Sequence, residues 1–125
     1  MIIIPSEHDE QVSLFQEMAL RAKQDPRWGK AFAIPNGGLR NIIVAKKLKA
    51  EGVRAGTPDI FIPVPAGPYC GMFLEMKRRA GGVVSSEQWA FMTSMHPHYF
   101  TAVGYGAADA IEKIATYFAA GGHFV

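Results

Sequence analysis

Apolar residues recur at helical spacing in four stretches of the chain. The first stretch covers residues 6–24. It begins at Ser6, a favoured N-cap, carries acidic residues in its first turn, and ends at Asp25-Pro26. Three further helices are predicted over residues 39–51, from Ser85 or Ser86 to about Met95, and over residues 107–119.

Short apolar runs bounded by glycine and proline predict four strands, over residues 31–35, 59–63, 71–77 and 99–103. The second and third strands are apolar on both faces, which is typical of strands buried between layers. The resulting order, α-β-α-β-β-α-β-α, predicts an α/β fold with a mixed central β-sheet flanked by helices. No repeat or long linker divides the chain, so residues 1–125 are predicted to form a single domain.

The composition is that of a soluble globular protein, with 49% hydrophobic and 19% charged residues in 125. The apolar runs are too short to cross a membrane, and the N-terminus lacks the features of a secretory signal. A single cysteine, Cys70, excludes an internal disulfide and a cysteine-based zinc cluster. We therefore expect a cytoplasmic, intracellular protein that is not associated with a membrane.

The net charge of +2 is too small to indicate a polyanionic partner, but the basic residues are clustered. One cluster is Lys77-Arg78-Arg79, and the other lies in residues 40–54, where a single acid accompanies Arg40, Lys46, Lys47, Lys49 and Arg54. Such clusters contact phosphates in some proteins and are solvated surface in more of them. Charge alone favours the solvated surface.

Three ionisable residues interrupt the two apolar strands. Asp59 opens one strand, and Glu75 and Lys77 lie on one face of the next, together with Phe73. If the strands pair, Asp59 lies across from Glu75, and the two carboxylates can converge on one cation. A ligand set made only of oxygen atoms favours Mg²⁺ or Mn²⁺. Such an ion lowers the pKa of a bound water and polarises a phosphoryl oxygen. Lys77 could then orient the attacking water or stabilise developing charge.

Two further residues are candidates for this site. Glu7 and Gln11 share a helix face that Leu14 and Met18 continue toward the core, so Glu7 could reach the cation. Gln88 lies in the first turn of the helix after Lys77 and could swing back over the site. Each candidate also has a structural interpretation on its own: Asp59 as a turn former, Glu75 with Lys77 as an exposed ion pair, Glu7 as a helix-dipole partner, and Gln88 as the capping-box partner of Ser85. Their joint occurrence favours the site.

In their order and spacing, these motifs resemble the VRR-NUC domains of the PD-(D/E)xK nuclease superfamily over nearly the whole chain. The matching segments are Glu7 with Gln11, Pro35-Asn36-Gly37-Gly38 with Arg40, Gly56-Thr57-Pro58-Asp59, Glu75-Met76-Lys77, Ser85 with Gln88 and Trp89, and Gly106 with Asp109-Ala110. The Val-Arg-Arg tripeptide that gives the family its name is not clearly present, since Lys77-Arg78-Arg79 is basic but different.

The resemblance implies a restriction-endonuclease-like core and a Mg²⁺- or Mn²⁺-dependent endonuclease that hydrolyses phosphodiester bonds in DNA. It implies that Asp59, Glu75 and the Met76 carbonyl bind the metal, that Lys77 is the catalytic lysine, and that Glu7 and Gln88 are accessory catalytic residues. Stand-alone domains of this kind, common in phages, resemble homodimeric nucleases of branched DNA such as Holliday junctions or flaps.

In this context, the residues predicted to contact DNA are Asn36, Arg40, Lys46, Lys47, Arg78 and Arg79. Trp28 and Trp89 are expected in the core rather than as base-stacking platforms. Two alternatives remain open: a restriction-type nuclease directed by sequence or modification, and a catalytically silent DNA-binding or assembly module. A nucleotide-binding protein ranks lower because the chain lacks a glycine-rich phosphate loop of the expected type.

Overall fold

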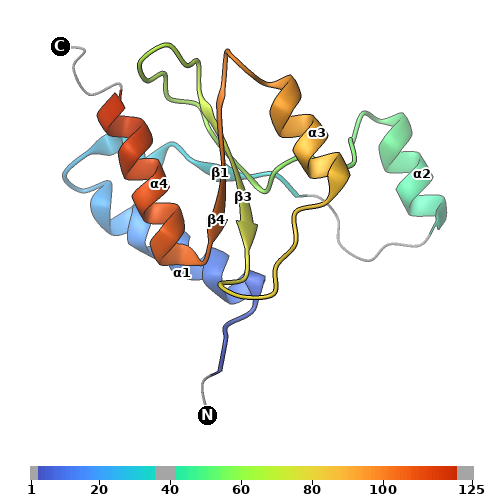
Figure 1. The fold of residues 1–125 in the computed structure, drawn as a ribbon, viewed down its shortest axis with the longest axis horizontal. Coiled ribbons are helices and arrows are strands. Elements are labelled where there is room, and N and C mark those ends of the chain that lie inside the picture. The colour runs from blue at the N-terminus through green and yellow to red at the C-terminus, as the bar shows by residue number, and fades with distance from the viewer. Residues whose placement is uncertain (1–2, 36–41, 121–125) are drawn as a thin grey trace.

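The computed structural model describes residues 3–35 and 42–120. In these residues the element order is the predicted one, with an additional 3₁₀ turn after the first helix (Figure 1). The elements are α1 (Glu7–Arg21), the 3₁₀ turn η1 (Pro26–Gly29), β1 (Phe32–Ala33), α2 (Ile42–Ala50), β2 (Ile60–Ile62), β3 (Met72–Lys77), α3 (Ser86–Ser94), β4 (Phe100–Tyr105) and α4 (Ala107–Ala120).

Helix α1 ends at Arg21, before Asp25-Pro26, and Asp25-Pro26 begins the 3₁₀ turn η1. The Asp25 side chain accepts a hydrogen bond from the backbone N–H of Arg27, so it caps the new turn. Proline is favoured at a first helical position because its missing N–H would be unpaired there anyway. The sequence predicted a helix that continues to residue 24, beyond the observed end at Arg21, and did not predict the turn η1.

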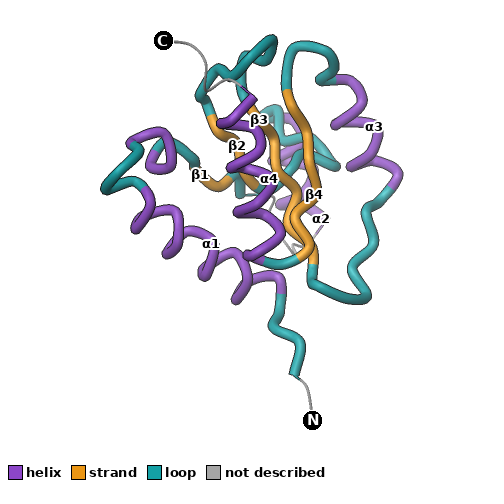
Figure 2. Tube along the Cα trace, turned by 60° about the vertical axis from the view of Figure 1, so that its left-hand side comes forward, coloured by secondary structure: helices purple, strands orange, loops and turns teal. Residues whose placement is uncertain are grey.

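The sheet is mixed, as predicted, with strand order β1-β2-β3-β4 (Figure 2). Strand β2 pairs antiparallel with β1 and β3, while β3 and β4 run parallel. A parallel pair needs a crossover connection, and α3 supplies it. Its place in the chain, between β3 and β4, sets it against one face of these strands.

The two faces of β3 have different chemistry. Leu74 and Met76 face the layer formed by α1 and α4, where the core is buried around Leu14 and Ile114 (Figures 1 and 2). The alternate residues face α3, and the ring of Phe73 meets that of Phe91 at a centroid distance of 5.4 Å. Strand alternation places Glu75 and Lys77 on this second face with Phe73, as predicted.

Helix α2 stands beside α3 and away from the main core (Figure 1). None of its side chains is buried, and its apolar residues Ile42 and Ile43 are exposed. An apolar groove, lined in part by Leu48 of α2 and by Phe91 and Met95 of α3, separates the two helices. No helix in residues 3–35 and 42–120 combines the length and the apolar character needed to cross a membrane.

The two tryptophans differ. Trp28 is buried and meets Phe118 edge to face at 5.1 Å between ring centroids, as expected of a core residue. The expectation that Trp89 lies in the core is wrong, because 53% of its surface is exposed. Helix α3 directs Gln88 and Phe91 toward the sheet, and residue 89 lies about 100° around the helix from residue 88. The side chain therefore lies on a flank of α3, outside the surface that faces the sheet.

Candidate active site

Asp59 lies across from Glu75, as the sequence analysis predicted. The β2–β3 register pairs Ile60 with Leu74, and its continuation by one residue sets Asp59 opposite Glu75. Two hydrogen bonds fix Asp59: its Oδ2 accepts from the backbone N–H of Met76 at 2.7 Å, and its carbonyl accepts from the N–H of Ile34 at 2.7 Å. Strand β3 thus holds the carboxylate of Asp59, and the residue after β1 holds its backbone.

Glu75 is the centre of the cluster and is only 2% exposed. Its Oε2 accepts a hydrogen bond from Nε2 of Gln88 at 2.7 Å and lies 3.3 Å from Nζ of Lys77. Its Oε1 is buried and accepts no hydrogen bond from any described residue. An unpaired buried carboxylate oxygen is costly, so this atom is an available ligand.

Burial and mutual repulsion make the two carboxylates difficult to ionise together. Burial raises the pKa of Glu75 to about 7, and the charge of Asp59 adds to this shift while Lys77 opposes it. Burial also raises the pKa of Asp59, although the Met76 N–H works in the other direction. The pair therefore retains a proton near neutral pH unless a cation replaces it.

Lys77 ends β3 and is 8% exposed, so its ammonium is enclosed beside Glu75. Its backbone carbonyl accepts a hydrogen bond from the N–H of Gly106. Gly82, in the loop after β3, approaches it so closely that an added Cβ would lie 2.9 Å from the Cβ of Lys77. The loop closes over the stem of the lysine because residue 82 has no side chain.

Gln88 both closes a capping box and contacts Glu75 of the site. It forms the capping box with Ser85: its Oε1 accepts from the Ser85 N–H at 2.8 Å, and the Ser85 hydroxyl accepts from the Gln88 N–H. Because the amide oxygen is occupied in this way, the amide nitrogen is directed at Glu75. The helix cap therefore orients a side chain of the site.

Gly56 explains why a glycine precedes the Thr57-Pro58-Asp59 segment. Its φ is +80°, and an added Cβ would lie 2.5 Å from backbone atoms of Glu87 and 2.9 Å from the N of Gln88. The chain before Asp59 therefore packs directly against the first turn of α3, which carries Gln88. Only glycine permits this approach.

We expect Gly56→Ala to push the start of α3 away and to break the contact between Gln88 and Glu75. Overpacking of this kind costs about 1–3 kcal/mol in the free energy of unfolding, measured by urea denaturation. Gly81→Ala is the matched control, since Gly81 has the same φ of +80° with nothing within 4 Å of an added Cβ. Equal losses in the two variants would show that backbone conformation, and not the contact with α3, is what residue 56 provides.

Glu7 is exposed in the first turn of α1. Within the described residues, no group of three or more His, Cys, Asp or Glu side chains is placed to hold a metal, so Glu7 does not form such a group with Asp59 and Glu75. Its accessory role remains a prediction. Leu14 and Met18 are buried, as expected, but the carboxylate that is buried with them belongs to Glu10.

Glu10 is 2% exposed and was missed by the sequence analysis. Its carboxylate accepts hydrogen bonds from Nε of Arg79 at 2.7 Å and from the N–H of Ala107 at 3.3 Å. Glu10 thus joins the loop after β3 to the start of α4. The hydrogen bond from Arg79 lowers the pKa of this carboxyl. The sequence signal was its four-residue spacing with Leu14 and Met18, which places all three on one helix face.

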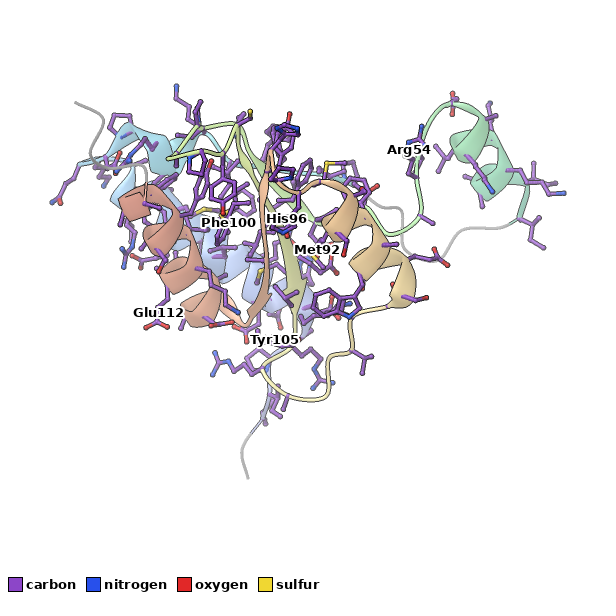
Figure 3. The ribbon with its side chains drawn as sticks, turned by 45° about the horizontal axis from the view of Figure 1, so that its top comes forward. Arg54, Met92, His96, Phe100, Tyr105 and Glu112 are labelled. Carbon is purple, nitrogen blue, oxygen red and sulfur yellow. The ribbon has the colours of Figure 1, made fainter. Side chains whose placement is uncertain are left out.

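The predicted DNA-contacting residues lie in two places. Lys46 and Lys47 are exposed on α2, which borders α3 on the side of the sheet that carries the site; Arg54, just after this helix, is labelled in Figure 3. Arg78 and Arg79 are exposed after β3, with Arg79 bound to Glu10. Asn36 and Arg40 lie outside the described residues.

Comparison with known proteins identifies the fold. No protein-family model matches the chain, and no curated protein matches it. A solved structure described as a "VRR_NUC domain protein" superposes with a TM-score of 0.79 at 23% sequence identity, covering 96% of this chain and 93% of that chain. The chain therefore has the fold of this VRR-NUC domain protein, which confirms the restriction-endonuclease-like architecture expected from the sequence.

Proposed function

We propose that the chain is a divalent-metal-dependent DNA endonuclease that hydrolyses phosphodiester bonds in branched or structured DNA, such as a Holliday junction or a flap, and that it acts as a homodimer. The observation that carries the proposal is the buried Glu75, with Lys77 beside it and the half-buried Asp59 across from it, on an otherwise apolar sheet face. The fold shared with a VRR-NUC domain protein supports it.

The residues present fit a hard divalent cation. Asp59 and Glu75 offer carboxylate oxygens, and the buried Oε1 of Glu75 has no other partner among the described residues. The resemblance to the family adds the carbonyl of Met76. Mg²⁺ is commonly held by one or two carboxylates together with substrate oxygens and water, so a two-carboxylate set suffices. When bound, such an ion supplies Lewis acidity toward a phosphoryl oxygen and lowers the pKa of water.

The two carboxylate oxygens of Glu75 differ in their contacts. Lys77 and Gln88 both contact Oε2, which leaves Oε1 for a ligand. The enclosed ammonium of Lys77 is available to stabilise the negative charge that develops on a phosphoryl group during hydrolysis. Gln88 is a positioning residue, because it sets the orientation of the Glu75 carboxylate.

The raised pKa of Glu75 predicts a pH dependence. Its value of about 7 in the fold exceeds its ordinary value of 4.5, so the folded protein binds this proton more tightly than the unfolded chain. Metal-free stability should therefore fall as the pH rises from about 4.5 to about 7, and stabilisation by Mn²⁺ should grow over the same window. Thermal unfolding with EDTA or Mn²⁺ measures both. In Glu75→Gln both dependences should flatten, and unchanged dependences would contradict the assignment to Glu75.

We expect charge reversal at Lys46 and Lys47 to weaken DNA binding in a salt-dependent manner. If both lysines contact phosphates, the slope of log affinity against log salt should become shallower by about 2. The matched control reverses Lys23 and Lys30, which are exposed at and beyond the C-terminal end of α1, in the other helical layer. Equal effects of the two double variants would mean that overall charge, and not α2, determines binding.

The function is tested by incubating the protein with single-stranded, duplex, flap and four-way-junction DNA, each with EDTA, Mg²⁺ or Mn²⁺. The proposal predicts cleavage that requires the metal and favours a branched form. Equal cutting of all forms would contradict the branched-DNA part. Tight binding to a branched form without cutting under any metal would favour the silent DNA-binding module.

A further inference from the structure

Trp89 is a large apolar side chain that the fold leaves in solvent. It is 53% exposed in the first turn of α3, and its indole makes no hydrogen bond or ring contact with any described residue. Trp28, by comparison, is buried against Phe118 and carries the guanidinium of Arg21 over its ring. Tryptophan is enriched at binding interfaces because its ring system is largely apolar while its N–H can remain in water.

The position of Trp89 ties it to the candidate site. It directly follows Gln88, whose amide nitrogen lies 2.7 Å from Glu75. The flank of α3 that borders α2 is lined by Glu87, Ala90 and Ser94, and helical geometry sets residue 89 on the opposite flank. The indole therefore lies outside the groove between the helices, on the residue that adjoins Gln88 in the chain.

Helix capping alone does not account for a tryptophan at this position. With Ser85 as N-cap, residue 89 is the one that can pack against residue 84 in a hydrophobic staple. An aliphatic side chain fills that role without exposing an aromatic face. An indole on the residue after Gln88 offers what a nucleobase requires, a flat π surface for stacking.

We propose that Trp89 stacks on an unpaired nucleobase next to the scissile phosphate, so that it favours branched DNA over continuous duplex. The reason is steric: in a paired duplex each base face is already covered by its neighbours, and only an unpaired or displaced base has a face to offer. This inference rests on the proposed function and assigns its substrate preference to one side chain.

The test is a binding cycle in EDTA, where no cutting occurs. The three probes are a duplex with one unpaired thymidine, the same duplex with an abasic site at that position, and a fully paired duplex. The proteins are wild type, Trp89→Phe and Trp89→Leu, the last of which keeps an apolar side chain for the staple. Leu20→Ala, which truncates a 58% exposed side chain on α1, is the control for loss of exposed apolar surface.

We expect Trp89→Leu to bind the unpaired-thymidine duplex about tenfold more weakly and the paired duplex within about twofold of wild type. Removal of the base should cost the wild type about the same factor and should cost Trp89→Leu nothing more. Trp89→Phe should retain most of the affinity. Independent effects of the protein and DNA changes, or equal weakening on all three probes, would overturn the inference.

A parallel cleavage assay with Mg²⁺ separates the two proposals. Coupling between Trp89 and the base without any cleavage would overturn the nuclease function and keep the stacking contact. Cleavage without coupling would overturn the stacking contact alone. No DNA binding by the wild type would overturn both.

Discussion

We expect Glu75→Gln to lower metal-dependent cleavage by at least about 10³-fold and to leave the metal-free fold no less stable near pH 8. The amide keeps the size of the side chain and an oxygen that Lys77 and Gln88 can approach, but it cannot supply a carboxylate to a cation. Loss of several kcal/mol of transition-state stabilisation corresponds to this factor in rate. Stability does not fall because the change removes a buried negative charge that repels Asp59.

The control for this variant is Asp109→Asn. It makes the same chemical change at a carboxylate of α4 that accepts from the Tyr105 N–H and pairs with Lys113. We expect lower thermal stability and unchanged cleavage. If Glu75→Gln retained wild-type cleavage rates, Glu75 would be a structural residue and the site assignment would be wrong.

Lys77→Met is expected to lower cleavage by about 10²–10³-fold while Mn²⁺ binding persists near pH 8. Methionine keeps most of the aliphatic stem, which matters because residue 77 is only 8% exposed. The ammonium is lost, and with it the stabilisation of charge developing on the phosphoryl group, an effect of this size for a single donor in other enzymes. Cleavage and Mn²⁺ binding are measured on the same preparation.

Lys113→Met is the matched control for the lysine. Like Lys77, Lys113 forms an ion pair with a carboxylate, that of Asp109 at 2.9 Å. In addition, its ammonium donates to the backbone carbonyl of Val103. It should keep full cleavage. Simultaneous loss of Mn²⁺ binding and cleavage in Lys77→Met would mean that the lysine maintains the carboxylate pair and does not act on the substrate.

The sequence predicted the part of the site that depends on strands. Strand alternation and the pairing of two adjacent apolar strands place Asp59 across from Glu75 and Lys77 on the same face, and these are local properties. Gln88 was also anticipated. Its double role was not, because the sequence alone gave the capping box and the contact with Glu75 as alternatives.

The parts that sequence analysis missed depend on how helices are oriented against the sheet. The spacing of Glu7 and Gln11 with Leu14 and Met18 suggested that Glu7 faces the site, yet Glu10 is the residue buried on that face. Trp89 was expected in the core because of its size. Helix periodicity gives the apolar face of a helix but not its rotation about its axis, which tertiary packing decides.

Helix α2 shows a different limit. Its apolar residues recur at helical spacing, but Ile42 and Ile43 are exposed because α2 lies beside α3 and not on the sheet. Helical periodicity identified the element correctly. It carries no information about whether another element of the chain covers the apolar side.

The proposed function requires a divalent cation held by Asp59 and Glu75. Mn²⁺ binding near pH 8, followed by electron paramagnetic resonance, tests this requirement most directly. The wild type, Asp59→Asn, Glu75→Gln and the Asp109→Asn control are titrated side by side. We expect saturable Mn²⁺ binding in the wild type and in Asp109→Asn, and loss of that binding in Asp59→Asn and Glu75→Gln. Wild-type binding that persisted in Asp59→Asn and Glu75→Gln would contradict it.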